Sequence, residues 1–227
     1  MLLAIDTATQ YISLALHDGD AIRAEQTWFS PNAHTAELAP AVRAILQQAD
    51  LTTGDLTAMA VSIGPGSYTG LRIGVALAKG LASARGLPLV GVGTLDILAS
   101  AQPHFQGGLI AVVQAGRGRV IAASYQWRKG RWKHRSEPQL MNWATLIASV
   151  DGPACLTGEV NDAGRDVVAS AAAQDVPIIL APAVSRLRRA GYLAEEGWTR
   201  LHEDPDGFQA ANIVPVYVTT KDIPTLS

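Results

Sequence analysis

The chain contains a single cysteine, Cys155, among 227 residues. One cysteine excludes an internal disulfide and a zinc site built from cysteines, and such scarcity fits a reducing cytosol. Charged residues are few as well, at 17% of the chain, and they leave a net charge of −2. Proteins that bind nucleic acid without a partner usually carry an excess of basic residues. Any contact with RNA is therefore expected to be local or made through a partner.

A long apolar run is also missing. The longest stretch without a formal charge, residues 97–116, contains three glutamines, a proline and a histidine, so it does not match a membrane span. The N-terminal run Leu2–Ile5 has no basic residue before it and ends at Asp6, which indicates a buried strand and not a signal peptide. We expect a cytoplasmic protein with no membrane segment.

Hydrophobic residues make up 48% of the chain, and their spacing predicts alternating strands and helices. In the first half, the expected strands are residues 2–8, 12–17, 21–28, 58–63 and 87–92, and the expected helices are residues 38–49, 69–85 and a segment from 94. In the second half, the expected strands are residues 109–114, 120–127, 131–135, 154–157, 177–180 and 213–218, and the expected helices are residues 143–150, 163–173 and 185–199.

The two halves resemble each other, and Leu2–Asp6 lines up with Ile110–Gln114. A duplicated βββαβα unit predicts an α/β fold with two similar mixed-sheet lobes facing across a cleft. Turn-forming residues cluster at 101–108, so we expect an N-terminal lobe at 1–102 and a C-terminal lobe at 103–227. The alternative is one undivided α/β domain.

A glycine-rich segment, residues 64–74, reads Gly-Pro-Gly-Ser-Tyr-Thr-Gly-Leu-Arg-Ile-Gly between a predicted strand and a predicted helix. Glycines let backbone N–H groups approach an anion at a helix N-terminus. The segment is not a Walker loop, since no Gly-Lys-Ser/Thr ends it, and its spacing misses the dinucleotide fingerprint. The residues alone fit a tight turn as well as a phosphate site.

The same segment resembles the signature of the TsaB (YeaZ) family. Other matching landmarks are Asp-Thr-Ala-Thr at 6–9, His-Thr-Ala-Glu-Leu at 34–38, Gly-Val-Gly-Thr-Leu at 91–95 and Pro-Val-Tyr at 215–217. The resemblance is strong through about residue 100 and thin afterwards. It implies an actin-like ATPase (ASKHA) fold and a role in making threonylcarbamoyladenosine beside the anticodon of certain tRNAs.

The resemblance also implies a non-catalytic scaffold that binds and positions the catalytic paralogue TsaD. It implies a TsaE-type ATPase in the larger complex, a homodimer in isolation, and only indirect contact with tRNA. In TsaD, a helix carries two histidines four residues apart that hold a metal, and the matching positions here are Thr94 and Leu98. None of the five histidines has another four residues away. We therefore expect no catalytic residue, no metal and no cofactor.

Two enzyme classes are the alternatives to this role. One is a nucleotide-dependent enzyme of the actin-like superfamily, such as a small-molecule kinase or an ATPase. Gln114 counts against it, because the family usually has a carboxylate there and magnesium would lose a hard ligand. The other is a peptidase, and the sequence argues against it because His-Glu-x-x-His and Gly-x-Ser-x-Gly are both missing. The expected vestigial nucleotide cleft consists of Asp6, Thr7, Gly64, Gly66, Ser67 and Gln114.

Asp6 has two possible roles, as an inherited carboxylate of the nucleotide cleft or as an acceptor for N–H groups of the following turn, and we favour the turn acceptor.

The helix at 69–85 carries a ridge of small residues, Gly70, Gly74, Ala78 and Ala82. Glycine inside a helix costs about 0.5–1 kcal/mol relative to alanine, so the ridge indicates a close contact with a partner helix. A second stripe, expected to face the lobe's own sheet, consists of Ile73, Leu77, Leu81 and Ala84. In the alternative, the ridge packs on that sheet. The expected partner interface consists of His34, Leu38, Val42, Gly70, Leu71, Gly74, Val75, Ala78, Lys79 and Ala82.

Basic and aromatic residues alternate at 127–135, which read Trp-Arg-Lys-Gly-Arg-Trp-Lys-His-Arg. This pattern is typical of a surface that holds phosphates and stacks bases. A sheet edge protected by lysine and arginine has the same composition. We interpret the segment as a protected edge.

Overall fold

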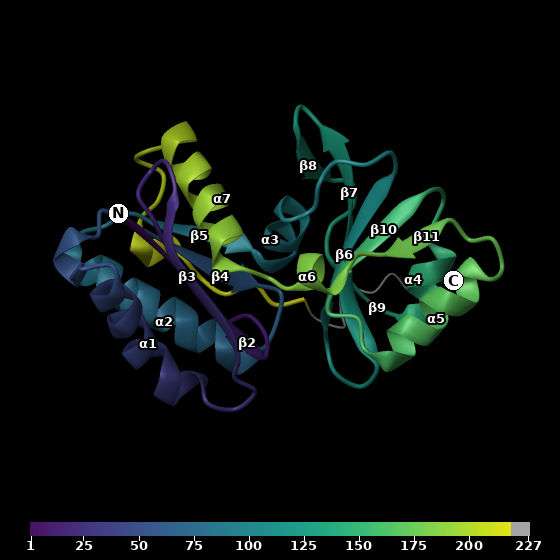
Figure 1. Ribbon diagram of the computed structural model, residues 1–227, viewed down its shortest axis with the longest axis horizontal. Helices are drawn as coiled ribbons and strands as arrows, with labels where there is room; N and C mark the ends of the chain where they lie inside the picture. The colour runs from purple at the N-terminus through teal and green to yellow at the C-terminus, as the bar shows by residue number, and fades with distance from the viewer. Residues whose placement is uncertain (219–227) are drawn as a thin grey trace. The chain divides into compact units, whose positions relative to one another are not determined.

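The structure, a computed structural model, describes residues 1–218 and divides into two compact units, each built on one mixed β-sheet (Figure 1). One unit contains Met1–Ile97 and Arg189–Val216, and the other contains Leu98–Arg188. Within residues 1–218, no helix is both long enough and apolar enough to cross a membrane.

The first unit has a five-stranded sheet in the order β3-β2-β1-β4-β5. β1 pairs antiparallel with β2 and parallel with β4. The strands are β1 (Leu2–Asp6), β2 (Tyr11–His17), β3 (Ile22–Phe29), β4 (Ala58–Gly64) and β5 (Leu89–Gly93).

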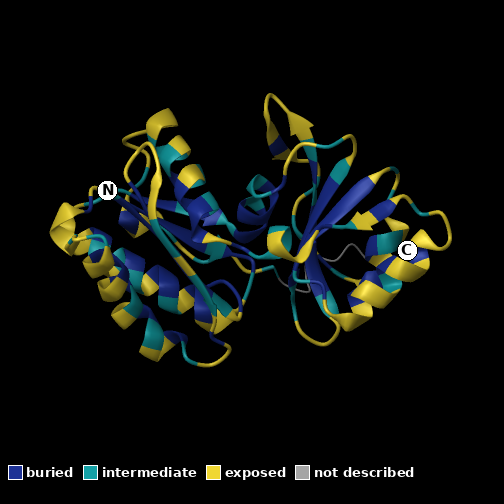
Figure 2. Ribbon diagram, viewed as in Figure 1, coloured by how far each residue is buried: buried dark blue, intermediate teal, exposed yellow. Residues whose placement is uncertain are grey.

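Helices cover both faces of this sheet (Figure 1). α1 (His34–Gln48) and α2 (Tyr68–Arg85) pack on one face, and α7 (Ala190–Glu203) packs on the other. Because side chains alternate along a strand, β1 supplies Leu3 and Ile5 to the first core and Leu2 and Ala4 to the second. The central strands are therefore buried on both sides, as their uninterrupted apolar runs predict (Figure 2). The remaining elements of this part are a 3₁₀ turn at Thr53–Asp55 and a 3₁₀ turn at Ala210–Asn212. The chain passes from the first unit to the second within α3 (Thr94–Ser100).

The second unit repeats the arrangement, with the strand order β8-β7-β6-β10-β11. Its central strand β6 pairs antiparallel with β7 and parallel with β10, as β1 pairs with β2 and β4. The strands are β6 (Gly108–Gln114), β7 (Arg119–Arg128), β8 (Arg131–His134), β9 (Gln139–Asn142), β10 (Ala154–Gly158) and β11 (Ile178–Leu180). The helices are α4 (Trp143–Ala148), α5 (Asp162–Ala172) and α6 (Ala183–Arg186). The duplicated two-lobe fold is confirmed.

The division of the chain differs from the expected boundary between residues 102 and 103. The helix expected at 185–199 is two helices, α6 and α7, and the second belongs to the first unit. A Cβ on Gly197 would lie 2.7 Å from the Cβ of Ala60, so glycine allows α7 to approach the first sheet closely. Residues 213–218 form no strand, and β9 is a strand that the sequence analysis did not predict.

Candidate functional site

The glycine-rich segment after β4 packs against the residues that follow β1. The Ser67 N–H donates to the Ala8 carbonyl oxygen at 2.6 Å, and a Cβ on Gly66 would lie 2.1 Å from the same oxygen. Ser67 also caps α2, because its Oγ accepts from the Gly70 N–H at 3.2 Å. The chain's own backbone therefore requires the glycine at 66, and no bound phosphate is needed to explain it.

The small-residue ridge of α2 continues this contact. The Thr7 hydroxyl donates to the Gly70 carbonyl oxygen at 2.7 Å. A Cβ on Gly70 would lie 2.2 Å from the Thr7 carbonyl oxygen, and a Cβ on Gly74 would lie 2.2 Å from the Thr7 Oγ1. The two glycines thus let α2 begin directly beside the end of β1.

The expected placement of the ridge at a partner interface is wrong. The buried residues of α2 are Gly70, Leu71, Gly74, Val75, Ala78 and Ala82. The stripe expected to face the sheet is instead the more exposed one, with Ile73, Leu77 and Leu81 half-buried and Ala84 exposed. Both stripes recur at helical spacing, and only the close approach of β1 decides which one is covered.

Asp6 lies at the end of β1, where its Oδ1 accepts from the Ala8 N–H at 2.9 Å. This is the role of a turn acceptor that the sequence favoured. Gln114 lies in the second unit, where its Nε2 donates to the Glu159 carbonyl oxygen at 2.8 Å. Its backbone N–H donates to the Glu159 Oε2 at 2.9 Å. The carboxylate of Glu159 therefore lies against the end of β6. The sequence did not reveal this carboxylate because Glu159 is far from Gln114 along the chain.

A groove of about 380 Å³ lies between α1 and α2, on the side of α2 away from the ridge. Its apolar lining consists of Ala39, Val42, Leu46, Leu51, Leu77 and Leu81. Arg43 and Gln47 add polar groups from α1. Of the ten expected interface residues, only Val42 lines this groove, and His34 and Leu38, on the same helix, lie outside its lining.

Comparisons with known proteins identify the family. Residues 29–188 match the family model for TsaD, the tRNA N6-adenosine threonylcarbamoyltransferase. The chain is 35% identical to the tRNA threonylcarbamoyladenosine biosynthesis protein TsaB of Bacillus subtilis over 69% of this chain and 70% of that one. This chain belongs to the TsaB family. As a TsaB-family protein it is related to TsaD, which explains why the TsaD model matches it.

Solved structures agree with this family and with the actin-like fold. YeaZ from Pseudomonas aeruginosa is 26% identical and superimposes with a TM-score of 0.73 over 96% of this chain and 99% of that one. The ROK hexokinase from Thermus thermophilus has 12% identity and a TM-score of 0.50 over 88% of this chain and 99% of that one. The second likeness shows the fold alone.

The segment that follows α7 packs against α2 and β4. Lys79 was expected at the partner interface, but its Nζ donates to the carbonyl oxygens of Ala211 and Ile213 in this segment at 3.1 and 2.9 Å. The Val216 N–H, in the Pro-Val-Tyr landmark, donates to the Ile63 carbonyl oxygen at 2.7 Å. The carbonyl oxygen of Val216 would lie 2.4 Å from a Cβ on Gly64. These contacts hold the segment after α7 against α2 and β4, a placement that no spacing in the sequence indicated.

Proposed function

We propose that this chain is the non-catalytic subunit that binds and positions TsaD in the machinery that makes threonylcarbamoyladenosine in tRNA. Membership of the TsaB family supports the pathway. The absence of a histidine pair four residues apart supports a role without metal catalysis. The groove between α1 and α2 carries the assignment of the docking surface.

The groove suits a helical partner because two helices of the same chain already form its walls. Leu77 and Leu81 are half-buried against the core and still line the groove. Covering them would remove further apolar surface from water, at about 25 cal/mol per Å². A stable contact of this kind usually buries about 1,200–2,000 Å² in total, so the partner must also cover the exposed outer residues of both helices.

We assign TsaD as the occupant, because the TsaD family model matches residues 29–188, a range that includes α1 and α2, so TsaD is expected to present an equivalent pair of helices. In isolation, a second copy of this chain takes the same place, so the homodimer and the TsaD complex exclude each other. A TsaE-type ATPase joins the larger complex. The chain itself needs no cofactor for this role.

A matched pair of substitutions tests the assignment. Leu77→Arg places a charged guanidinium in the groove, where it can still reach water while its aliphatic stem lies on the apolar lining. The variant should therefore fold, become monomeric and lose co-elution with TsaD. Ala169→Arg adds the same charge at an exposed position of α5, outside both docking helices, and should keep both assemblies. The charge reversal Arg43→Glu repeats the test at the polar rim without touching the core.

The measurement is size-exclusion chromatography with TsaD, together with the melting temperature of each variant. A folded Leu77→Arg protein that still co-elutes with TsaD contradicts the groove assignment. Failure of the unmodified chain to bind TsaD contradicts the scaffold role itself.

A further inference from the structure

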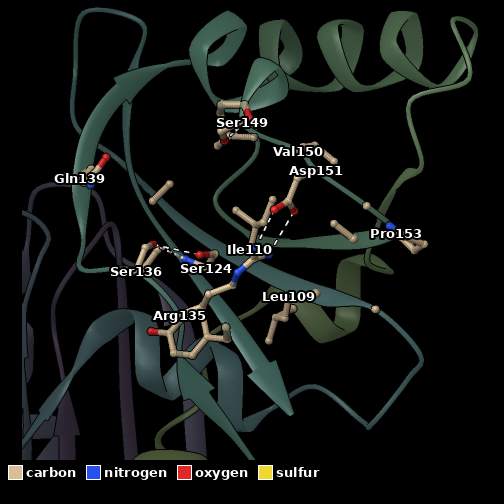
Figure 3. A pocket seen from close by; sticks show the side chains of 18 of the residues that line it. Leu109, Ile110, Ser124, Arg135, Ser136, Gln139, Ser149, Val150, Asp151 and Pro153 are labelled. Carbon is tan, nitrogen blue, oxygen red and sulfur yellow. Dashed lines mark hydrogen bonds and ion pairs between the residues drawn. The ribbon is translucent and has the colours of Figure 1, made fainter. Parts of the chain in front are cut away.

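The second unit contains a pocket of about 600 Å³ beside α4 (Figure 3). Pockets of this size hold small molecules or single flat groups in other proteins. Its apolar lining includes Ile110, Ala122, Met141 and Leu146. Hydroxyl groups of Ser124 and Ser136 and the amide of Gln139 also line it, so a ligand with an apolar body and polar edges fits its chemistry.

An ion pair lies at this pocket. The Arg135 guanidinium donates to both oxygens of Asp151, with Nη1–Oδ1 at 3.1 Å and Nη2–Oδ2 at 2.5 Å (Figure 3). The pair lowers the pKa of Asp151 and raises that of Arg135, so both stay charged. Both side chains are more than half exposed, and Arg135 is therefore accessible to an anion that competes with Asp151.

Strand register extends the pocket into a row of basic side chains. Alternate residues of a strand share a face, so Gln126 and Arg128 follow Ser124 on the pocket's side of β7. Lys133 pairs with Gln126, and Arg131 pairs with Arg128. The basic row is defined as Arg128, Arg131 and Lys133, all of them exposed.

The aromatic residues of the same hairpin lie on the opposite face. Trp132 is buried, lies 5.1 Å from the ring of Phe105 and donates from its Nε1 to the Gln102 carbonyl oxygen. Trp127 lies 4.9 Å from the ring of His104. The alternation seen in the sequence therefore separates into an aromatic face that packs on the unit itself and a basic face that continues the pocket.

The basic row is a local charge excess. Residues 128–137 carry five basic side chains and one acidic one, Glu137, in a chain whose net charge is −2. β8 is an edge strand, so protection of the edge explains one or two of these charges. It does not explain why they continue a pocket.

We propose that the pocket and the basic row form one RNA-binding surface, with an unstacked base in the pocket and the adjoining phosphates along the row. Proteins that recognise single-stranded RNA combine the same two parts, a basic track for the backbone and a site for splayed bases. The proposal rests on the proposed function, which makes tRNA the substrate, and it adds a direct contact where the sequence predicted an indirect one.

The test measures tRNA affinity of the reconstituted complex with TsaD over a series of salt concentrations. Arg128→Gln/Lys133→Gln should weaken binding about tenfold at low salt and make the slope of log affinity against log salt shallower by about 1.5. Its control is Arg23→Gln/Arg117→Gln, which removes two exposed arginines outside α1, α2, the pocket lining and the basic row and should leave the slope unchanged.

Two further variants separate the charge from the pocket. Asp151→Asn releases Arg135 from its ion pair and should tighten tRNA binding severalfold, the opposite of what loss of a structural contact would do. Gln139→Ala removes an uncharged pocket group and should weaken binding without changing the salt slope.

Co-elution with TsaD, measured on the same samples, distinguishes the two proposals. If the unmodified chain does not bind TsaD, the proposed function fails and the titrations are run on the chain alone. Unchanged affinity and slope in Arg128→Gln/Lys133→Gln overturn the RNA surface. The same result with increased aggregation would show that the row only protects the edge strand. Unchanged affinity in Gln139→Ala overturns the placement of a base in the pocket.

Discussion

Gly74 and Gly80 lie in the same helix, α2, and should respond oppositely to alanine. A Cβ at Gly74 would lie 2.2 Å from the Thr7 Oγ1, whereas a Cβ at Gly80 would meet nothing within 4 Å. In both substitutions, the higher helix propensity of alanine should by itself raise the free energy of unfolding by about 0.5–1 kcal/mol, because glycine destabilises a helix interior relative to alanine. The difference between the two variants therefore isolates the contact with Thr7.

The surroundings of Thr7 determine the free-energy cost of placing a Cβ against it. Thr7 is fully buried and β-branched, so its side chain has little freedom to move away. Displacing it breaks the hydrogen bond to the Gly70 carbonyl oxygen, at a net cost of about 1 kcal/mol, and overpacking adds about 1–3 kcal/mol. Gly74→Ala should then lower the free energy of unfolding by about 1–3 kcal/mol, and Gly80→Ala should raise it by about 0.5–1 kcal/mol.

Urea and thermal unfolding of the isolated chain measure both values. For a chain of this size, 1 kcal/mol corresponds to about 2–4 °C, so the melting temperatures should differ by roughly 10 °C. The double variant Thr7→Ala/Gly74→Ala removes the clashing hydroxyl and should be more stable than the sum of the single effects predicts. Equal stability of Gly74→Ala and Gly80→Ala, or strictly additive effects in the double variant, would refute the packing of α2 on β1.

Four further outcomes are expected. Ala78→Arg should unfold at least about 10 °C early, because Ala78 is fully buried and an unpaired buried charge costs several kcal/mol; a normal melting temperature would contradict this placement. The isolated chain should hydrolyse no ATP above background, and magnesium-dependent turnover that Asp6→Ala abolishes would contradict the non-catalytic role. The Trp28 Nε1 donates to Glu37 at 2.7 Å and holds the pKa of that carboxyl below its usual range. The hydrogen bond to Glu37 therefore stabilises the folded chain above about pH 4.3, and this stabilisation is lost as the pH falls through the lower pKa that Glu37 has in the folded state. In urea titrations, Glu37→Gln should lose less stability on acidification than the unmodified chain. Burial raises the pKa of the Cys155 thiol, so a thiol reagent should label it slowly in the native chain and rapidly in urea; equal rates would place Cys155 at the surface.

Local patterns in the sequence determined the duplicated architecture. The apolar runs at Leu2–Asp6 and Ile110–Gln114 predicted two equivalent central strands, and the structure has β1 and β6 there. Such runs are informative because a strand buried on both faces leaves no position for a polar side chain. The family was also readable, because the glycine-rich segment and Asp6 are short local signatures.

Tertiary structure alone decided which surfaces are covered. The stripe with Ala78 and the stripe with Leu77 have the same helical period, and only the end of β1 determines which one faces inward. The unit to which α7 belongs was equally undetermined, since its apolar face fits any sheet of the right shape. The pocket beside Arg135 and Asp151 likewise joins residues from separate segments. Periodicity tells which side chains share a face, whereas the neighbour of that face depends on contacts between distant parts of the chain.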